Sequence, residues 1–335
     1  MKIVFNSKLP DAASSAFYHD GLQRLHNISF FDYEHWHNYD VALFMTYKPD
    51  LEDLKAAKTS CPSLVTAIVD PRGSWVKSYL EYADFLIVDS IEMRDYWAYT
   101  GLPIFEYAEF PDLKVHKKTY SHEDQKIIIG YHGNKIHLDS MRNTIVPALE
   151  RLSRETEIEL WAMYNIAALG RWDRNMPGIE IRHIQWSMEN YYEYMARVDI
   201  GIVPCFLPER NWSAILDMPL LKKFNRYRKN GDDYLLRFKM PTNPGRIIVW
   251  GLLNIPVVSD FFPSAMQCID DGKNGLLACS SGGWYQALKR FADDPRYRQL
   301  CADKLTESVV ENYGYDIQNE RLMAFLQGQF DLGQG

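Results

Sequence analysis

The stretch from residue 239 to residue 275 constrains the fold more than any other part of the sequence. Its apolar residues are spaced first as a helix and then as a short buried strand, and a second helix, a turn and another strand follow. These elements are predicted at residues 244–254, 255–259, 261–269, 270–275 and 276–279. Helices and strands that alternate through short connections are typical of a parallel α/β sheet. Ligands of such sheets bind at the carboxyl ends of the strands, which places Ser259 in a predicted ligand site.

The same alternation runs through the rest of the chain, which is long enough, at 335 residues, for about two domains. Residues 1–115 show a strand–helix rhythm that predicts a Rossmann-like domain. A new apolar strand near Ile127 restarts the pattern, and we expect a second such domain over residues 124–314. The intervening polar segment, residues 107–123, is the predicted linker, and a last helix is predicted over residues 316–335.

Three motifs follow one another in the second half: Pro256-Val-Val-Ser, Asp271-Gly-Lys-Asn-Gly and a helix led by Trp284. This series resembles the nucleotide-sugar signature of GT-B glycosyltransferases of the family-4 type. The resemblance implies two doubly wound domains facing a cleft, with the sugar donor in the second domain and the acceptor in the first. It also implies a last helix that crosses back to the first domain and a reaction that needs no bound metal.

One departure from the family pattern concerns its two carboxylates. Similar retaining enzymes carry E-x7-E, with the second Glu seven residues before the proline of the P-V-V strand. In this chain those positions are Pro241 and Val249. Glu209 is a candidate for the missing sugar-binding carboxylate, as is Asp217. The departure leaves both the donor and the retention of configuration open.

The loop Gly130-Tyr-His-Gly-Asn-Lys lies between a predicted strand and a predicted helix. Glycine permits a tight turn and a close approach of the backbone to a ligand. Similar enzymes place a glycine-rich loop here against the donor diphosphate, so Gly133, Asn134 and Lys135 are candidate diphosphate-binding residues. His132 is a candidate catalytic residue. A plain tight turn with a structural histidine is the alternative.

A second candidate for the diphosphate site is the loop that begins the helix at residue 244. Residues 219–246 contain eight Lys and Arg against two Asp, which suits a small anionic ligand. Lys239 and Arg246 can pair with phosphate oxygens, Arg in a bidentate manner. Asn243 is placed to bind the donor as well. The alternative is that Asn243 only caps the helix and Arg246 forms a surface ion pair.

Asp70 follows an apolar strand of the first domain and precedes a proline. A base for an acceptor hydroxyl, or a group that binds the acceptor, belongs at such a strand end. Asp89 holds the equivalent place one strand further on. An aspartate before proline is also a common turn former, and this alternative remains for Asp70.

Composition excludes several other classes of protein. Residues 1–115 contain 10 Lys and Arg against 17 Asp and Glu, which disfavours broad binding to nucleic acid or to an anionic membrane. We find no run of about 18 apolar residues, so at most peripheral membrane contact is expected. The five scattered cysteines favour a reducing, cytoplasmic location. No D-x-D, P-loop, H-E-x-x-H or G-x-S-x-G motif occurs.

The sequence therefore predicts a metal-independent hexosyltransferase without a cofactor. It would move a sugar from a nucleotide-diphosphate donor to a saccharide, lipid-linked or other hydroxyl acceptor, in polysaccharide or glycoconjugate synthesis. Retention is implied by the resemblance alone. Two alternatives stay open: a non-catalytic subunit that binds nucleotide sugars, which the missing carboxylates favour, and a nucleotide-sugar 2-epimerase.

Overall fold

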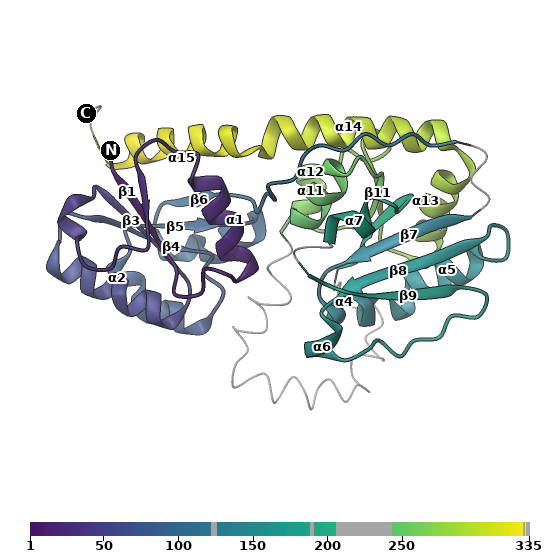
Figure 1. Ribbon diagram of the computed structural model, residues 1–335, viewed down its shortest axis with the longest axis horizontal. Coiled ribbons are helices and arrows are strands. Elements are labelled where there is room, and N and C mark those ends of the chain that lie inside the picture. The colour runs from purple at the N-terminus through teal and green to yellow at the C-terminus, as the bar shows by residue number, and fades with distance from the viewer. Residues whose placement is uncertain (122–125, 188–190, 206–242, 331, 333–335) are drawn as a thin grey trace. The chain divides into compact units, whose positions relative to one another are not determined.

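The computed structural model describes residues 1–121, 126–187, 191–205, 243–330 and 332, which form two compact units (Figure 1). Unit 1 contains the described residues of 1–112 and 313–332, together with Asn243. Unit 2 contains the described residues of 113–205 and 244–312. The chain therefore passes from unit 1 to unit 2 and returns to unit 1 for its last helix.

Unit 1 is built on a six-stranded parallel sheet with the order β2-β1-β3-β4-β5-β6. Its strands are β1 (Ile3–Asn6), β2 (Ile28–Phe30), β3 (Val41–Met45), β4 (Val65–Val69), β5 (Phe85–Val88) and β6 (Ile104–Glu106). The four strands β1, β3, β4 and β5 are buried along their whole length. Strands of this kind read as continuous apolar runs because helices cover both faces of the sheet.

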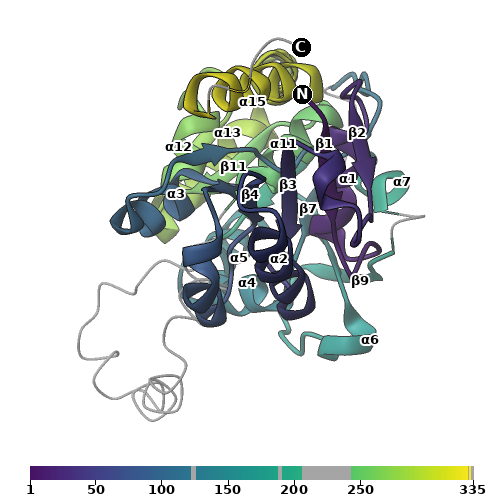
Figure 2. The ribbon, with the colours of Figure 1, turned by 90° about the vertical axis from the view of Figure 1, so that its left-hand side faces the viewer.

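The helices of unit 1 divide between the two faces of this sheet (Figure 2). They are α1 (Ala13–Leu22), η1 (Trp36–Asn38), α2 (Lys48–Ser60), η2 (Ser74–Tyr82), α3 (Ile91–Trp97), η3 (Ala98–Thr100) and α15 (Tyr315–Phe330). One core contains Leu51 and Leu54 of α2 and Met93 of α3. The other contains Tyr18 of α1 and Leu322 of α15. Alternate residues of each strand thus contribute to opposite cores.

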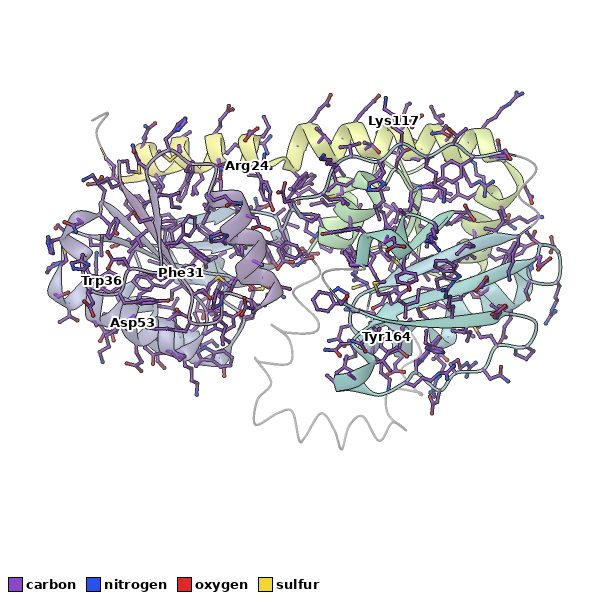
Figure 3. The ribbon with its side chains drawn as sticks, viewed as in Figure 1. Arg24, Phe31, Trp36, Asp53, Lys117 and Tyr164 are labelled. Atoms are coloured by element: carbon purple, nitrogen blue, oxygen red, sulfur yellow. The ribbon has the colours of Figure 1, made fainter. Side chains whose placement is uncertain are left out.

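Helix α15 is joined to the body of unit 1 by buried amide side chains. The Asn319 Nδ2 atom donates to the Gly21 carbonyl at 2.9 Å, and its Oδ1 accepts from the Tyr107 hydroxyl at 2.9 Å. Gln318 hydrogen-bonds both the N–H and the carbonyl of Ala108. At the surface Arg24, labelled in Figure 3, contacts Asp112 at 3.0 Å. The last helix is therefore an integral part of the first sheet's covering.

Unit 2 contains a second six-stranded parallel sheet, with the order β12-β11-β10-β7-β8-β9. Its strands are β7 (Ile127–His132), β8 (Ile158–Tyr164), β9 (Glu180–Gln185), β10 (Ile200–Val203), β11 (Val257–Asp260) and β12 (Leu276–Ala278). All strands are parallel. From the centre of the sheet, β7, β8 and β9 follow one another toward one edge, and β10, β11 and β12 follow one another toward the other edge. The order therefore reverses between β7 and β10, which is the place where doubly wound sheets bind their ligands.

Two layers of helices cover this second sheet. The helices are α4 (Lys135–Ser140), η4 (Met141–Asn143), α5 (Ile145–Leu152), α6 (Ile166–Leu169), α7 (Tyr191–Met195), α11 (Gly245–Leu252), α12 (Pro263–Cys268), α13 (Ser281–Asp293) and α14 (Pro295–Tyr313). Helices α5 and α13 share one core with Trp284. On the opposite face Trp250 of α11 packs directly against Gly130 and Gly201, where a Cβ would come within 3.0 Å of its indole ring.

Several local expectations from the sequence are confirmed. The helix predicted from residue 244 ends before Asn254, which has a left-handed φ of 56°. The helix predicted after the loop Gly130-Tyr-His-Gly-Asn-Lys is divided into α4, η4 and α5. The short β2, β6 and α6 had no strong periodic signal. No helix within the described residues is both long and apolar enough to cross a membrane.

The packing of α15 leads to a first prediction. Replacing Leu326, which is fully buried in the core of unit 1, by Ala should lower the free energy of unfolding by about 2–5 kcal/mol. Gly328 lies on the same helix with no atom within 4 Å of a Cβ position, so Gly328→Ala should be neutral or stabilising. Thermal unfolding of both variants checks this, and equal effects would contradict the placement of α15.

Candidate functional site

The strongest candidate site in unit 2 lies at the carboxyl ends of the neighbouring strands β7 and β10, where the strand order reverses. Gly133 follows β7 with a φ of 140°, a conformation that favours glycine. A Cβ at Gly133 would lie 3.3 Å from Cδ of Arg246, which stands in the first turn of α11. The Nη1 atom of Arg246 donates to the Pro204 carbonyl at 2.9 Å, just beyond β10. The structure thus brings together two predicted site residues that are 113 positions apart in the sequence.

The guanidinium of Arg246 dominates the electrostatics of this place. Together with burial, its charge lowers the pKa of His137. It also opposes the burial that raises the pKa of Asp260 to about 6. The Tyr131 hydroxyl, which donates to the Asn134 carbonyl at 2.6 Å, is a further neighbour of the guanidinium. A half-buried arginine with one N–H on a carbonyl retains further N–H donors that can bind an anion.

His132 is enclosed in the protein. It is 4% exposed, hydrogen-bonds the Tyr191 hydroxyl and packs against Trp250 with ring centroids 4.8 Å apart. Burial, followed by the nearby Arg246 charge, lowers the pKa of His132 to about 3, so the ring is neutral near pH 7. This environment favours the structural alternative over a role in proton transfer to substrate.

Asn134 and Lys135 each have a defined structural task. The Oδ1 atom of Asn134 accepts from the Ile136 N–H at 3.1 Å and caps α4. The Nζ atom of Lys135 donates to the carbonyls of Leu169 and Arg171 at 3.0 and 3.1 Å. Gly133 donates its own N–H to the Met163 carbonyl at 3.1 Å, and Tyr131 and Arg246 fill the space where its side chain would be. Of this loop, the exposed Asn134 remains the best placed to touch a ligand.

Ser259 and Asp260 end β11 at the same edge of the sheet. The hydroxyl of Ser259 is fully buried and faces the Val203 carbonyl at 3.4 Å, which turns it away from a ligand. Asp260 accepts from the Cys205 N–H at 2.7 Å and from the Trp284 indole at 2.9 Å. Asp260 therefore ties the loop after β10 to β11 and α13. The sequence shows it only as a polar residue that ends a strand.

In unit 1 the candidate is the turn after β4, where Asp70 has a φ of 55°. Its N–H donates to Ile87 at 2.8 Å, while the Trp97 indole donates to the Pro71 carbonyl at 3.1 Å. Arg72, two positions after Asp70, donates its backbone N–H to the Thr46 hydroxyl at 3.3 Å. Left-handed backbone at a buried non-glycine residue is strained, and such strain is concentrated at functional sites.

Three carboxylates surround Arg72 at this edge of the first sheet. Its guanidinium pairs closely with Asp70 and Asp89 and approaches Glu109 at 3.4 Å. Asp89 is 1% exposed, and its Oδ1 atom has no hydrogen-bond partner among the described residues. These groups come from the ends of successive strands, so the parallel sheet itself assembles them. Sequence analysis missed Arg72 and Glu109, although Arg72 follows Asp70 by two positions.

Burial and mutual repulsion keep this cluster from ionising fully. Burial raises the pKa of Asp70 to about 7, with Arg72 opposing the shift and Asp89 and Glu109 adding to it. Burial likewise raises the pKa of Glu109. Three carboxylates beside one guanidinium would carry a net charge of −2, and desolvation makes that state costly. The cluster can thus hold a proton near neutral pH.

Asn243 belongs to this cluster rather than to the start of α11. Its Nδ2 atom donates to Asp89 at 3.0 Å and to Glu109 at 2.9 Å. The predicted helix cap at Asn243 is wrong, because Pro244 occupies the cap position and no side chain caps the helix. Lys239, Glu209 and Asp217 lie outside the described residues. Among the described residues, no group of three or more His, Cys, Asp or Glu side chains is arranged to hold a metal.

Comparison with known proteins gives no match to a family model and no significant match to a curated protein. Solved structures do match. Anabaena HepE in complex with UDP and glucose superposes with a TM-score of 0.60 at 13% identity, covering 98% of this chain and 100% of that one. The fold is GT-B.

Two further GT-B structures agree with this assignment. The sucrose-phosphate synthase of Thermosynechococcus elongatus gives a TM-score of 0.54 at 11% identity, covering 97% of this chain and 80% of that one. The pneumococcal O-GlcNAc transferase GtfA, in complex with UDP and GlcNAc, gives 0.50 at 10% identity, with 88% and 57% covered. The expected fold class is therefore confirmed.

The contact between Gly133 and Arg246 leads to a second prediction. Gly133→Ala places a Cβ 2.8 Å from the Tyr131 hydroxyl in a conformation that side chains rarely adopt. We expect a loss of about 1–3 kcal/mol in the free energy of unfolding. Gly282→Ala, which has no atom within 4 Å of the new Cβ, is the matched control and should be nearly neutral. Urea denaturation compares them, and a neutral Gly133→Ala would contradict the strained geometry.

The raised pKa of Asp70 leads to a third prediction. Between about pH 4 and pH 7 the folded state keeps a proton on Asp70 that the unfolded chain has already lost. The free energy of unfolding should therefore fall as pH rises through this window. Asp70→Asn removes this contribution, so its stability should decline less between pH 5 and pH 8 than that of the wild type.

The exposed residue Asp11 provides the control for this experiment. Asp11→Asn should keep the pH dependence of the wild type in the same urea titrations. An Asp70→Asn variant whose stability changes with pH as steeply as the wild type would show that this carboxyl does not hold the proton.

Proposed function

We propose that the protein is a glycosyltransferase that transfers a sugar from a nucleotide-diphosphate donor to an acceptor hydroxyl. The observation that carries the proposal is the meeting of Arg246 and Gly133 at the switch point of the second sheet. Arginine binds diphosphate oxygens through paired N–H donors, and the missing side chain at Gly133 lets Arg246 lie against the backbone after β7. UDP is the nucleotide that the structures of HepE and GtfA contain, so a UDP-sugar is the donor we favour over a GDP-sugar.

The chemical role of this site is to stabilise the leaving diphosphate. Negative charge develops on the bridging oxygen as the glycosidic bond of the donor breaks. A fixed guanidinium beside that oxygen lowers the free energy of the transition state without a metal ion. Asn134, in the loop after β7, adds a polar contact. This arrangement supports a metal-independent reaction.

The acceptor is proposed to bind to unit 1 at the cluster around Arg72. Asp70 would accept a hydrogen bond from the reacting hydroxyl, while Arg72 and Asn243 hold the neighbouring carboxylates. Retention of configuration, which the family resemblance implies, leaves Asp70 to bind and orient the hydroxyl. Inversion would make Asp70 the base that removes its proton. The anomeric configuration of the product, read by NMR, separates these two roles.

The strained, buried cluster in unit 1 supports an enzyme over a non-catalytic binding subunit. A non-catalytic subunit gives no reason for the left-handed backbone conformation of Asp70. It also gives no reason for a buried Asp89 oxygen without a hydrogen-bond partner among the described residues. A 2-epimerase needs no acceptor site. The acceptor is proposed to be a saccharide, and the product part of a polysaccharide or glycoconjugate.

A fourth prediction tests the donor site. UDP should raise the melting temperature of the wild type, because a ligand that binds only the folded state stabilises it. Arg246→Ala should weaken UDP binding by about 10- to 100-fold, as expected for loss of a charged hydrogen-bonding partner. Arg296→Ala, at an exposed position of unit 2, is the control and should bind as the wild type does. Absence of any shift with UDP, GDP or their sugars would contradict the donor site.

Turnover tests the acceptor side separately. Asp70→Asn should retain the thermal shift with UDP but lower kcat by about 100-fold or more. Because the ionised carboxylate is the active form, the rate of the wild type should rise between pH 5 and pH 8. Release of an isomerised free sugar, with no glycoside formed, would instead establish the epimerase.

A further inference from the structure

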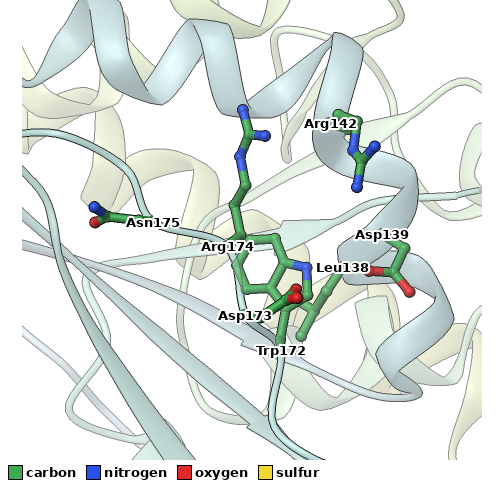
Figure 4. Close-up of a pocket in the computed structure, with 7 residues that line it drawn as sticks. All are labelled: Leu138, Asp139, Arg142, Trp172, Asp173, Arg174 and Asn175. Carbon is green, nitrogen blue, oxygen red and sulfur yellow. The ribbon is translucent and has the colours of Figure 1, made fainter.

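A small polar pocket in unit 2 lies apart from the contact between Arg246 and Gly133. It has a volume of about 270 Å³ and is lined by two segments of the chain (Figure 4). Leu138, Asp139 and Arg142 come from α4 and η4, and residues 172–175 come from the connection between β8 and β9. Pockets for drug-sized molecules occupy roughly 300–1,000 Å³, so this one suits a ligand about the size of a single ring.

The connection that lines the pocket is held by several hydrogen bonds, one of them buried. Trp172, which is 4% exposed, donates its backbone N–H to the Tyr164 hydroxyl at 2.7 Å. The same hydroxyl, on a residue labelled in Figure 3, lies 2.9 Å from Nδ1 of His183. Lys135 holds the preceding residues through the Leu169 and Arg171 carbonyls. The connection therefore has a defined shape before any ligand arrives, which reduces the entropy lost on binding.

The polar side chains of the pocket are not paired with one another. Arg142 and Arg174 supply two guanidiniums, and Asp139 and Asp173 supply two carboxylates. Within the described part of the chain, no hydrogen bond or ion pair joins any arginine of the pocket to either aspartate. The Nε atom of Arg174 is buried without an acceptor among the described residues. A buried donor of this kind is costly to leave unsatisfied, which favours binding of an acceptor group there.

The balance of charge selects the chemistry of that ligand. An anion would gain from the two guanidiniums but would be repelled by the two carboxylates, and a cation would meet the reverse. A hydroxyl group both donates and accepts, so it satisfies carboxylates and guanidiniums together. The Asn175 amide adds one more donor and acceptor. The Trp172 side chain supplies an apolar wall for the C–H groups of a ring.

From these observations we propose that the pocket binds an uncharged sugar ring at a site separate from the nucleotide. The separation follows from the construction of unit 2. The nucleotide is assigned to the carboxyl ends of β7 and β10, whereas the pocket lies over α4, η4 and the β8–β9 connection. The sugar is thus held by unit 2 in addition to the donor and does not take part in bond breaking. The proposal goes beyond the transferase activity and stands without it.

The test uses the whole protein and three probes: methyl α-D-glucopyranoside, N-acetylglucosamine and sucrose. Binding is detected by saturation-transfer NMR, with and without saturating UDP. Arg174→Gln and Asp139→Asn should each weaken binding of the responding sugar by about tenfold, the effect of losing one charged hydrogen bond. Arg154→Gln, at an exposed position of the same unit, is the control and should leave binding unchanged.

Each outcome decides the question. Sugar binding that persists with UDP and falls in both pocket variants, while their melting temperatures and UDP shifts stay unchanged, supports the proposal. Sugar binding displaced by UDP would assign the sugar to the donor site, and a response to inorganic phosphate that falls in Arg174→Gln would assign the pocket to an anion. Either result overturns the proposal, as does the absence of a signal for all three sugars. Failure of UDP to bind would contradict the proposed function alone.

Discussion

The contact of Trp250 with two glycines determines how the candidate donor site is built. Gly130 in β7 and Gly201 in β10 have no side chains, so the indole ring lies directly on the sheet at the junction of these strands. A side chain at Gly201 would clash with the indole ring, and one at Gly130 would clash first with Val198 and then with the ring. Because α11 is seated there, Arg246 in its first turn reaches the Pro204 carbonyl and Gly133. The position of the charge depends on close packing, which tolerates little displacement.

Both units place a half-buried arginine at the carboxyl edge of a parallel sheet, with different electrostatic surroundings. In unit 2 burial, followed by the charge of Arg246, lowers the pKa of His132, and Arg246 opposes the burial that raises the pKa of Asp260. In unit 1 Arg72 is outnumbered by carboxylates, and the pKa values of Asp70 and Glu109 are raised. In the proposed function, the edge with Arg246 binds the anionic leaving group and the edge with Arg72 binds the acceptor hydroxyl.

Sequence periodicity predicted most of the regular structure because strands buried on both faces are nearly continuous apolar runs. The strand–helix rhythm predicted for residues 1–115 corresponds to strands such as β1, β3, β4 and β5. The short β2 and β6 have only partly buried residues, so their pattern carries little information. For the candidate site, Gly133 and Arg246 were recognised because glycine and arginine have distinctive chemistry in a loop. Asn243 was predicted to bind the donor, with helix capping as the alternative. The capping alternative is wrong, and the partners that Asn243 does contact, Asp89 and Glu109, lie far away in the sequence.

The sequence by itself determined the class of fold, the order of strands and helices, and which residue types stand at the ends of strands. These properties depend on local spacing and on the burial of apolar side chains. Only the tertiary structure decided which of those residues act together. In the structure His132 and Ser259 are buried, and the Lys135 side chain hydrogen-bonds the Leu169 carbonyl. Asp70 lies beside Arg72 and Glu109. Such partnerships depend on distances across neighbouring strands, and a linear pattern of residues does not contain them.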